Sequence, residues 1–162
     1  MPDAPLRIAV LLEDGFEDDE LRTLIDVFDA GGARLMLLAP FAQRHYNGRH
    51  LRLTLTSELA AHKARADMFS AIVIPGGYAP DKLRMRHAML DLVRDGVAGG
   101  IPIGAIGHGP QVLISAAVVA GLIAVEKTVP SRPIATYGVA ALLLGLGVLL
   151  FVAPDAIPSL TI

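Results

Sequence analysis

One short stretch of the sequence has the pattern of a catalytic turn. Residues 105–110 read Ala-Ile-Gly-His-Gly-Pro, with an apolar run before them and a helical pattern after them. A strand, a sharp turn and a helix in this order predict a nucleophile elbow, in which one strained residue points its side chain over the edge of a sheet. The N-terminus of the following helix can stabilise a developing oxyanion. The nucleophile position holds Gly107, so this turn has the form of a catalytic site without the reacting atom.

Four further features could contribute to a site at this turn. His108 follows the empty position and could act as a general base or proton shuttle, although a single histidine is often structural. Glu17 begins a predicted helix beyond a predicted strand, where it could supply a carboxyl group or only complement the helix dipole. Asp81 could reach the site or a neighbouring subunit, or simply cap a turn. Gly76 and Gly77 follow another strand, where the backbone can approach a ligand or make a plain tight turn.

Alternating strands and helices must hold these positions. Apolar runs without alternation predict buried strands, and apolar residues at helical spacing predict helices between them. The predicted strands are residues 8–12, 35–38, 71–74 and 102–106, and the predicted helices are residues 17–30, 87–97 and 111–120, the last ended by Gly121. Residues 79–86 are predicted as a loop or short turn. The β-α-β opening implies a right-handed crossover, so we expect an α/β fold: a flavodoxin-like parallel sheet flanked by helices on both faces.

Residues 41–56 interrupt this alternation. Asn47-Gly48 is a hairpin turn signal, and apolar and polar residues alternate over residues 51–55 as in a half-exposed strand. We therefore expect a small β-hairpin here. Residues 57–70 indicate a polar connection with some helical character.

The composition restricts the class of protein. The chain has 162 residues, enough for a single domain over 1–162, with 53% hydrophobic and 19% charged residues. Its net charge of −2 gives no case for nucleic-acid binding. It has no cysteine, which excludes disulfides, thiolate metal sites and thiol catalysis, and its histidines show no metal-ligand spacing. Without a phosphate-loop, dinucleotide or signal-peptide pattern, we expect no cofactor, no metal and a cytoplasmic location.

Residues 131–162 are the least regular part of the sequence. Residues 134–153 carry no charge and are long enough for a transmembrane helix. However, Gly145 and Gly147 split this run into a helix-like and a strand-like half, and no basic or aromatic belt follows it. We therefore favour burial in a soluble domain over membrane insertion.

Three motifs carry a family resemblance. They are Phe16-Glu17-Asp18 with Glu20-Leu21, the run from Val73 to Asp81, and the elbow with its helix from Ala105 to Ala116. Together they resemble the ThiJ/PfpI superfamily, whose fold is of the class I glutamine-amidotransferase type, and above all its PfpI-type intracellular proteases and general stress proteins. The likeness covers residues 6–130, whereas residues 131–162 match poorly.

The resemblance implies a role for each candidate residue. The family reads Ala-x-Cys-His-Gly-Pro at the elbow, so Gly107 stands where the nucleophilic cysteine is expected. His108 is then the partner imidazole, and Glu17 is the acid that hydrogen-bonds the thiol. Asp81 matches a glutamate contributed across a subunit interface, which implies a homodimer or higher homo-oligomer. The implied oxyanion-binding backbone belongs to Gly76, Gly77 and His108.

Several functions follow from this resemblance. Family activities include peptidase, glyoxalase or deglycase, and holdase chaperone work, and Gly107 closes those that need a thiol. The first hypothesis is a catalytically degenerate or disarmed stress-related protein that binds a small molecule or peptide at the elbow. The second is an active hydrolase or glyoxalase/deglycase whose nucleophile is missing in this variant. A holdase-type chaperone and a membrane-anchored relative are the further alternatives.

Overall fold

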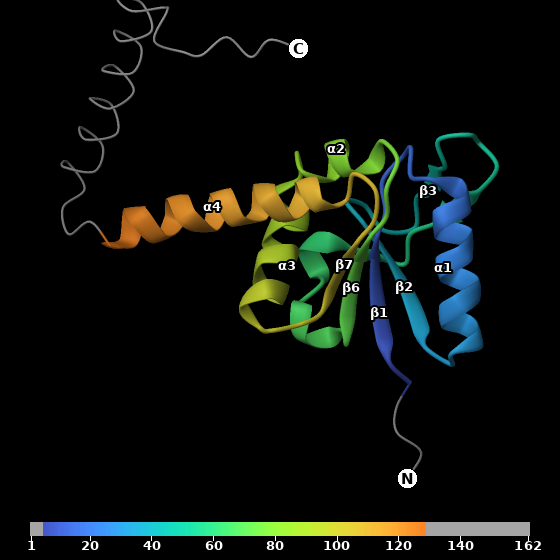
Figure 1. The fold of residues 1–162 in the computed structure, drawn as a ribbon, viewed down its shortest axis with the longest axis horizontal. Coiled ribbons are helices and arrows are strands. Elements are labelled where there is room, and N and C mark those ends of the chain that lie inside the picture. The colour runs from blue at the N-terminus through green and yellow to red at the C-terminus, as the bar shows by residue number, and fades with distance from the viewer. Residues whose placement is uncertain (1–4, 129–162) are drawn as a thin grey trace, which may run out of the picture. The chain divides into compact units, whose positions relative to one another are not determined.

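The computed structural model describes residues 5–128. At the centre of this part lies a five-stranded sheet with the strand order β5-β2-β1-β6-β7 (Figure 1). The strands are β1 (Arg7–Leu11), β2 (Arg34–Ala39), β5 (Leu59–Ala60), β6 (Ala71–Ile74) and β7 (Ile103–Ala105). The pairings of this sheet are parallel, as predicted. The short strand β5 was not expected within the connection 57–70.

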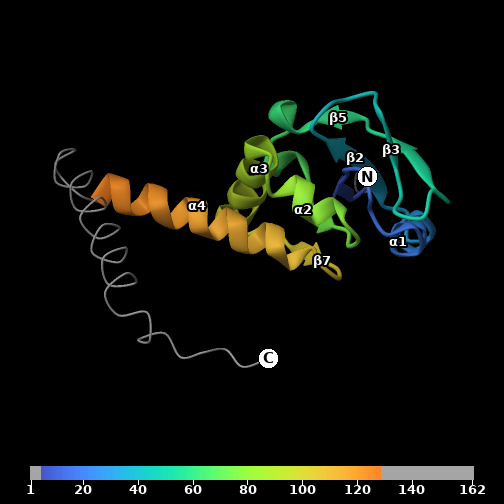
Figure 2. The ribbon, with the colours of Figure 1, turned by 90° about the horizontal axis from the view of Figure 1, so that it is seen from above.

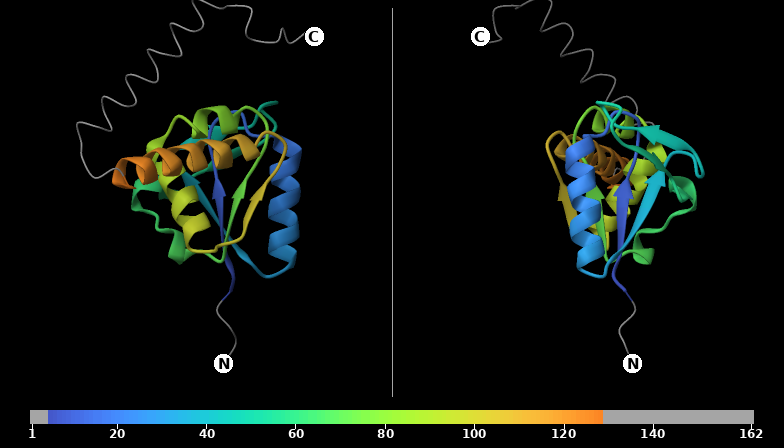
Figure 3. Two further views of the ribbon diagram at one scale, coloured as in Figure 1. Left: turned by 60° about the vertical axis from the view of Figure 1, so that its left-hand side comes forward. Right: turned by 90° about the vertical axis from the view of Figure 1, so that its right-hand side faces the viewer.

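Helices cover both faces of the sheet, which confirms the predicted fold class (Figures 2 and 3). Helix α1 (Asp18–Ala30) covers one face, where its Leu21 packs with the buried Val10 of β1. On the other face, Leu11 packs in one cluster with Val93 of α3 (His87–Ala98) and Val112 of α4 (Pro110–Thr128). The 3-10 turns η1 (Ala61–Lys63) and η2 (Ala66–Met68) contribute to this second cluster. Successive β1 residues therefore alternate between two apolar layers, as the absence of polar alternation predicts.

The hairpin expected at residues 41–56 is present with a different turn. Its strands are β3 (His45–Asn47) and β4 (Thr54–Thr56), so a loop of residues 48–53 replaces the expected two-residue turn. In this loop Leu51 has a φ of 56° and is 78% exposed. The loop is drawn out because the carboxylate of Asp18 accepts backbone hydrogen bonds from it, as described below.

Two further expectations were wrong about helix limits. Residues 79–86 contain the helix α2 (Ala79–Leu83) rather than only a loop, since Pro80 lies in the first turn, where its fixed φ suits a helix. Helix α4 does not end at Gly121 but continues to Thr128. One glycine inside a helix costs only about 1 kcal/mol, and alanine and leucine next to Gly121 favour the helix.

Residue contacts divide the chain into two units, Met1–Ala120 and Gly121–Ile162. The site described below lies in the first unit, and the single domain expected over 1–162 stays a prediction. In the part of the chain from 5 to 128, none of the helices combines the length and apolar character needed to span a membrane. The uncharged run 134–153 lies outside the described residues.

Candidate functional site

The candidate site lies at the carboxyl edge of the sheet. Strands β1, β6 and β7 are neighbours, and their carboxyl ends lead into residues 13–17, the Gly76-Gly77 turn and the elbow (Figure 1). In parallel sheets this edge is where ligands bind. The topology therefore brings together the three motifs that the sequence places far apart.

The elbow is formed as the sequence predicts. The Ile106 N–H donates to the Ile74 carbonyl oxygen at 3.0 Å, and the Gly109 N–H donates to the Ile106 carbonyl oxygen at 2.7 Å. Gly107 is exposed and has a φ of 53°, a left-handed conformation that side-chain-bearing residues rarely adopt. A Cβ atom at Gly107 would lie 3.5 Å from both Glu20 Oε1 and Gly76 Cα, so the turn has room for a side chain.

The carboxylate beside the empty position belongs to Glu20, not to Glu17. Glu20 is half-buried, and its Oε2 accepts a hydrogen bond from the Gly76 N–H at 3.0 Å. Glu17 is the N-cap of α1, whereas Glu20 lies in the first turn, where a glutamate can reach back toward the loop before the helix. The sequence shows the spacing of these two acids. Which of their side chains points toward the elbow depends on the residue at which α1 begins.

Glu17 instead faces two basic side chains of the loop 48–53. Its Oε2 lies 3.5 Å from Arg49 Nη1, and its Oε1 lies 3.4 Å from His50 Nε2. The Arg49 guanidinium carbon lies 4.7 Å above the centre of the Tyr78 ring, a cation–π contact. Arg49 and His50 are not predicted as site residues from the sequence, because no local pattern links them to Glu17.

Asp18 holds this loop against α1. Its side chain is buried, and its carboxylate accepts hydrogen bonds from the backbone N–H groups of His50 at 2.8 Å, Arg52 at 2.9 Å and Leu53 at 2.8 Å. Burial by itself would raise the pKa of Asp18, but the backbone hydrogen bonds outweigh burial and leave that pKa below its ordinary value. Asp18 therefore stays ionised and positions the loop that carries Arg49 and His50.

The predicted oxyanion donors are not equivalent. The Gly76 N–H is already bound to Glu20, so Gly76 is not available as a donor. Gly77 has a φ of 81°, and its neighbour Tyr78 donates its N–H to the Gly15 carbonyl oxygen at 2.7 Å. His108 is exposed between Gly107 and the start of α4. The backbone N–H groups of Gly77 and His108 therefore remain the predicted oxyanion donors.

Asp81 lies in the first turn of α2, and its side chain is 57% exposed. Its Oδ1 lies 4.0 Å from Arg84 Nη1. The same Arg84 nitrogen donates to Gln111 Oε1 at 3.2 Å, which links α2 to the first turn of α4. Arg84 therefore connects Asp81 to the elbow helix α4. The role of Asp81 across a subunit interface stays a prediction.

The family assignment rests on a match to most of the described chain. The profile of the DJ-1/PfpI family matches residues 6–128, which contain the elbow, Glu20 and the Gly76-Gly77 turn. The chain belongs to the DJ-1/PfpI family. This confirms the resemblance to the ThiJ/PfpI group.

Known DJ-1/PfpI relatives give the same assignment. The chain is 36% identical over 115 residues to "Protein/nucleic acid deglycase 2" of Escherichia coli, covering 71% of this chain and 67% of that protein. It is 32% identical over 116 residues to "Deglycase PfpI" of Pyrococcus furiosus, covering 72% of this chain and 69% of that protein. It is 30% identical over 110 residues to "General stress protein 18" of Bacillus subtilis, covering 68% and 64%. The match thus spans about two thirds of these relatives.

Solved structures of DJ-1/PfpI proteins share this fold. A two-domain protein of Anabaena variabilis with DJ-1/ThiJ/PfpI-like and ferritin-like domains is 32% identical, with a TM-score of 0.67 over 68% of this chain and 32% of that one. Drosophila melanogaster DJ-1beta is 22% identical, with a TM-score of 0.64 over 70% and 61%.

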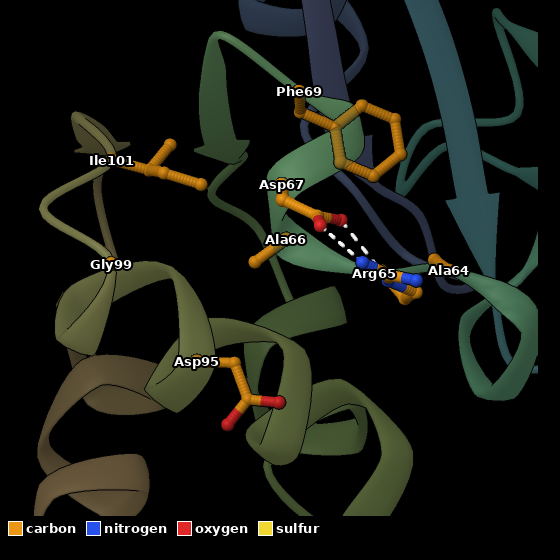
Figure 4. Close-up of a pocket in the computed structure, with 8 residues that line it drawn as sticks. All are labelled: Ala64, Arg65, Ala66, Asp67, Phe69, Asp95, Gly99 and Ile101. Carbon is orange, nitrogen blue, oxygen red and sulfur yellow. Dashed lines mark hydrogen bonds and ion pairs between the residues drawn. The ribbon is translucent and has the colours of Figure 1, made fainter.

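A cavity of about 490 Å³ has no elbow residue among those that line it (Figure 4). Residues 64–67 and Phe69 line it from one side, and Asp95, Gly99 and Ile101 line it from the other. Because β6 and β7 begin just after these segments, the cavity is at the amino edge of the sheet, opposite the elbow. An ion pair between Arg65 and Asp67 stands at this cavity.

We expect the Asp18→Asn substitution to lower the free energy of unfolding by about 2–3 kcal/mol at neutral pH. The amide removes the charge and turns one acceptor into a donor facing backbone N–H groups, and a buried donor without a partner costs about 1–3 kcal/mol. Chemical denaturation monitored by circular dichroism measures the loss. The matched control is Asp19→Asn, because Asp19 occupies the same helix turn with a 74% exposed side chain, and its loss should stay below about 1 kcal/mol.

The pH dependence of the same variant has a definite sign. Since the pKa of Asp18 is lower in the folded chain, its contribution is complete above the pKa of an unfolded aspartate and is lost as the pH falls through the folded pKa. The difference between the unsubstituted chain and Asp18→Asn should therefore shrink below about pH 4. A difference that stays constant down to pH 2 would contradict this role.

Proposed function

We propose that this chain is a thiol-free member of the DJ-1/PfpI family that binds glycated amines at the elbow without forming a covalent thiol adduct. The observation that carries this proposal is Gly107, which keeps the left-handed elbow conformation beside the Glu20 carboxylate but has no nucleophile. The chain has no cysteine elsewhere that could replace it. The covalent route is therefore closed, while the elbow backbone and the carboxylate beside it are kept.

The class of ligand comes from the relatives. Two of those described above are named deglycases and one a general stress protein. A deglycase acts on amines that carry a carbonyl-derived adduct. The amides of Gly77 and His108 and the Glu20 carboxylate supply donors and an acceptor for the polar groups of such an adduct. A homodimer that adds Asp81 of a second copy to this site is part of the proposal.

Ligand binding at the elbow can be tested by NMR. We expect a stable glycated amine, Nα-acetyl-Nε-(1-carboxyethyl)lysine, to shift the amide signals of Gly76, Gly77, Gly107 and His108 in the ¹⁵N-labelled chain. A Gly107→Leu substitution should abolish these shifts, because its side chain would fill the space beside Glu20. Gly104→Leu, an exposed β7 position, is the control and should keep them. Shifts that are absent, or that persist in Gly107→Leu, would contradict the proposal.

A further inference from the structure

The loop 48–53 brings an imidazole to the side chain of Glu17, whose backbone N–H contacts the Gly76-Gly77 turn. His50 Nε2 lies 3.4 Å from Glu17 Oε1, while Arg49 contacts the other oxygen of the same carboxylate. The His50 side chain is 44% exposed and that of Glu17 is 22% exposed, so both can be reached by a ligand. A carboxylate next to an imidazole orients the ring.

Several contacts fix this pair relative to the Gly76-Gly77 turn. The His50 N–H is held by Asp18 at 2.8 Å, and the Arg49 N–H donates to the Phe16 carbonyl oxygen at 2.7 Å. The Glu17 N–H donates to the Gly76 carbonyl oxygen at 3.3 Å. Arg49 also stacks on Tyr78, the residue that follows Gly77. The pair is therefore anchored to the turn that carries the predicted oxyanion donor.

We propose that Glu17 and His50 form an acid–base pair that breaks carbinolamines, the first adducts of aldehydes with amines, without a thiol. This inference rests on the proposed function, because it requires the glycated amine to bind at the elbow. It concerns chemistry that Gly107 does not block, since breakdown of a carbinolamine needs proton transfers and no nucleophile.

One imidazole can carry out both proton transfers of this reaction. A carbinolamine carries a hydroxyl group and an amine on the same carbon. His50 takes the hydroxyl proton on Nδ1, the ring nitrogen that does not contact Glu17, and the O–H electron pair becomes the second C–O bond. The C–N bond breaks, its electron pair goes to the amine nitrogen, and this nitrogen takes the proton back from His50. The products are the free aldehyde and the free amine, and Glu17 stabilises the imidazolium between the two transfers.

The test uses the full chain and the carbinolamine of methylglyoxal with Nα-acetyl-lysine. After dilution, ¹H NMR follows the release of free amine in the presence of the unsubstituted chain, His50→Gln, Glu17→Gln or His62→Gln. The exposed His62 of η1 is the matched control. We expect the unsubstituted chain and His62→Gln to accelerate release equally. The His50→Gln rate should fall at least about tenfold and the Glu17→Gln rate about fivefold, less than the roughly hundredfold usual for general acid–base groups, because the pair is partly exposed.

Elbow binding by each variant separates the two proposals. The inference is supported if His50→Gln loses the rate but still shows the shifts of the elbow amides with the stable glycated amine. It is overturned, with the proposed function intact, if His50→Gln binds this ligand and releases amine as fast as the unsubstituted chain. If the unsubstituted chain gives no elbow shifts, the proposed function fails, and this inference fails with it.

Discussion

Replacing Gly107 by cysteine is expected to produce a protein that consumes methylglyoxal at least about a thousandfold faster than the unsubstituted chain. The elbow conformation and the Glu20 carboxylate are in place beside the missing atom, His108 is the next residue along the chain, and there is space for a Cβ atom at 3.5 Å from its neighbours. In the best-studied hydrolase, removing the nucleophile alone lowers the rate by on the order of a million-fold. Restoring it on an otherwise intact site should recover part of such a factor.

The matched control for this gain is Gly107→Ser. Serine has the same backbone strain and nearly the same size as cysteine, but its hydroxyl group is a far weaker nucleophile at neutral pH. Both variants must adopt a φ near the 53° of Gly107, which costs roughly 1–2 kcal/mol, so both should unfold at a lower temperature than the unsubstituted chain. If cysteine and serine variants are folded and equally inactive, the idea of an otherwise intact site is wrong.

The largest loss of stability is expected for Gly77→Ala. A Cβ atom at Gly77 would lie 2.7 Å from the Glu17 nitrogen and 2.9 Å from the Phe16 carbonyl carbon, and it would also collide with the Gly15 carbonyl oxygen. These are backbone atoms of the segment between β1 and α1, so they cannot move without separating the two motifs that form the site. Together with a φ of 81°, this predicts a loss of more than about 4 kcal/mol, a large part of the stability of a typical domain.

Gly100→Ala isolates the conformational part of that loss. Gly100 has a φ of 70°, and no atom lies within 4 Å of where its Cβ would stand. Its substitution should therefore cost only about 1–2 kcal/mol in denaturant unfolding. Equal losses for Gly77→Ala and Gly100→Ala would show that the contact between Gly77 and residues 15–17 does not hold the site together.

The elbow could be predicted from sequence because its determinants are local. The apolar strand, the glycines and the helix follow one another directly, and glycine at 107 is compatible with the left-handed turn that the structure shows. Gly109 adds a local requirement, since its Cβ would lie 2.7 Å from the Ile74 carbonyl oxygen. The parallel sheet was predictable for a similar reason, because uninterrupted apolar strands separated by amphipathic helices have few alternative arrangements.

The sequence did not decide which acid serves the elbow. From the sequence alone, Glu17 and Glu20 are equally plausible partners of the elbow. In the structure Glu17 is the N-cap of α1, whereas Glu20 lies three residues later in the first turn, where its carboxylate reaches the Gly76 amide. The contact of Glu17 with His50 joins residues of two separate segments and depends on Asp18, a buried acid that draws the loop 48–53 onto the helix.

The sequence by itself thus determined the family, the fold class and the absence of a thiol nucleophile at the elbow. These follow from local patterns and from composition, which folding does not change. Only the tertiary structure decided that Glu20 faces Gly107, that Gly76 is already hydrogen-bonded, and that Glu17 meets His50. Side-chain partners of this kind depend on helix phase and on loop paths in three dimensions, and both are set by long-range hydrogen bonds that leave no regular spacing along the chain.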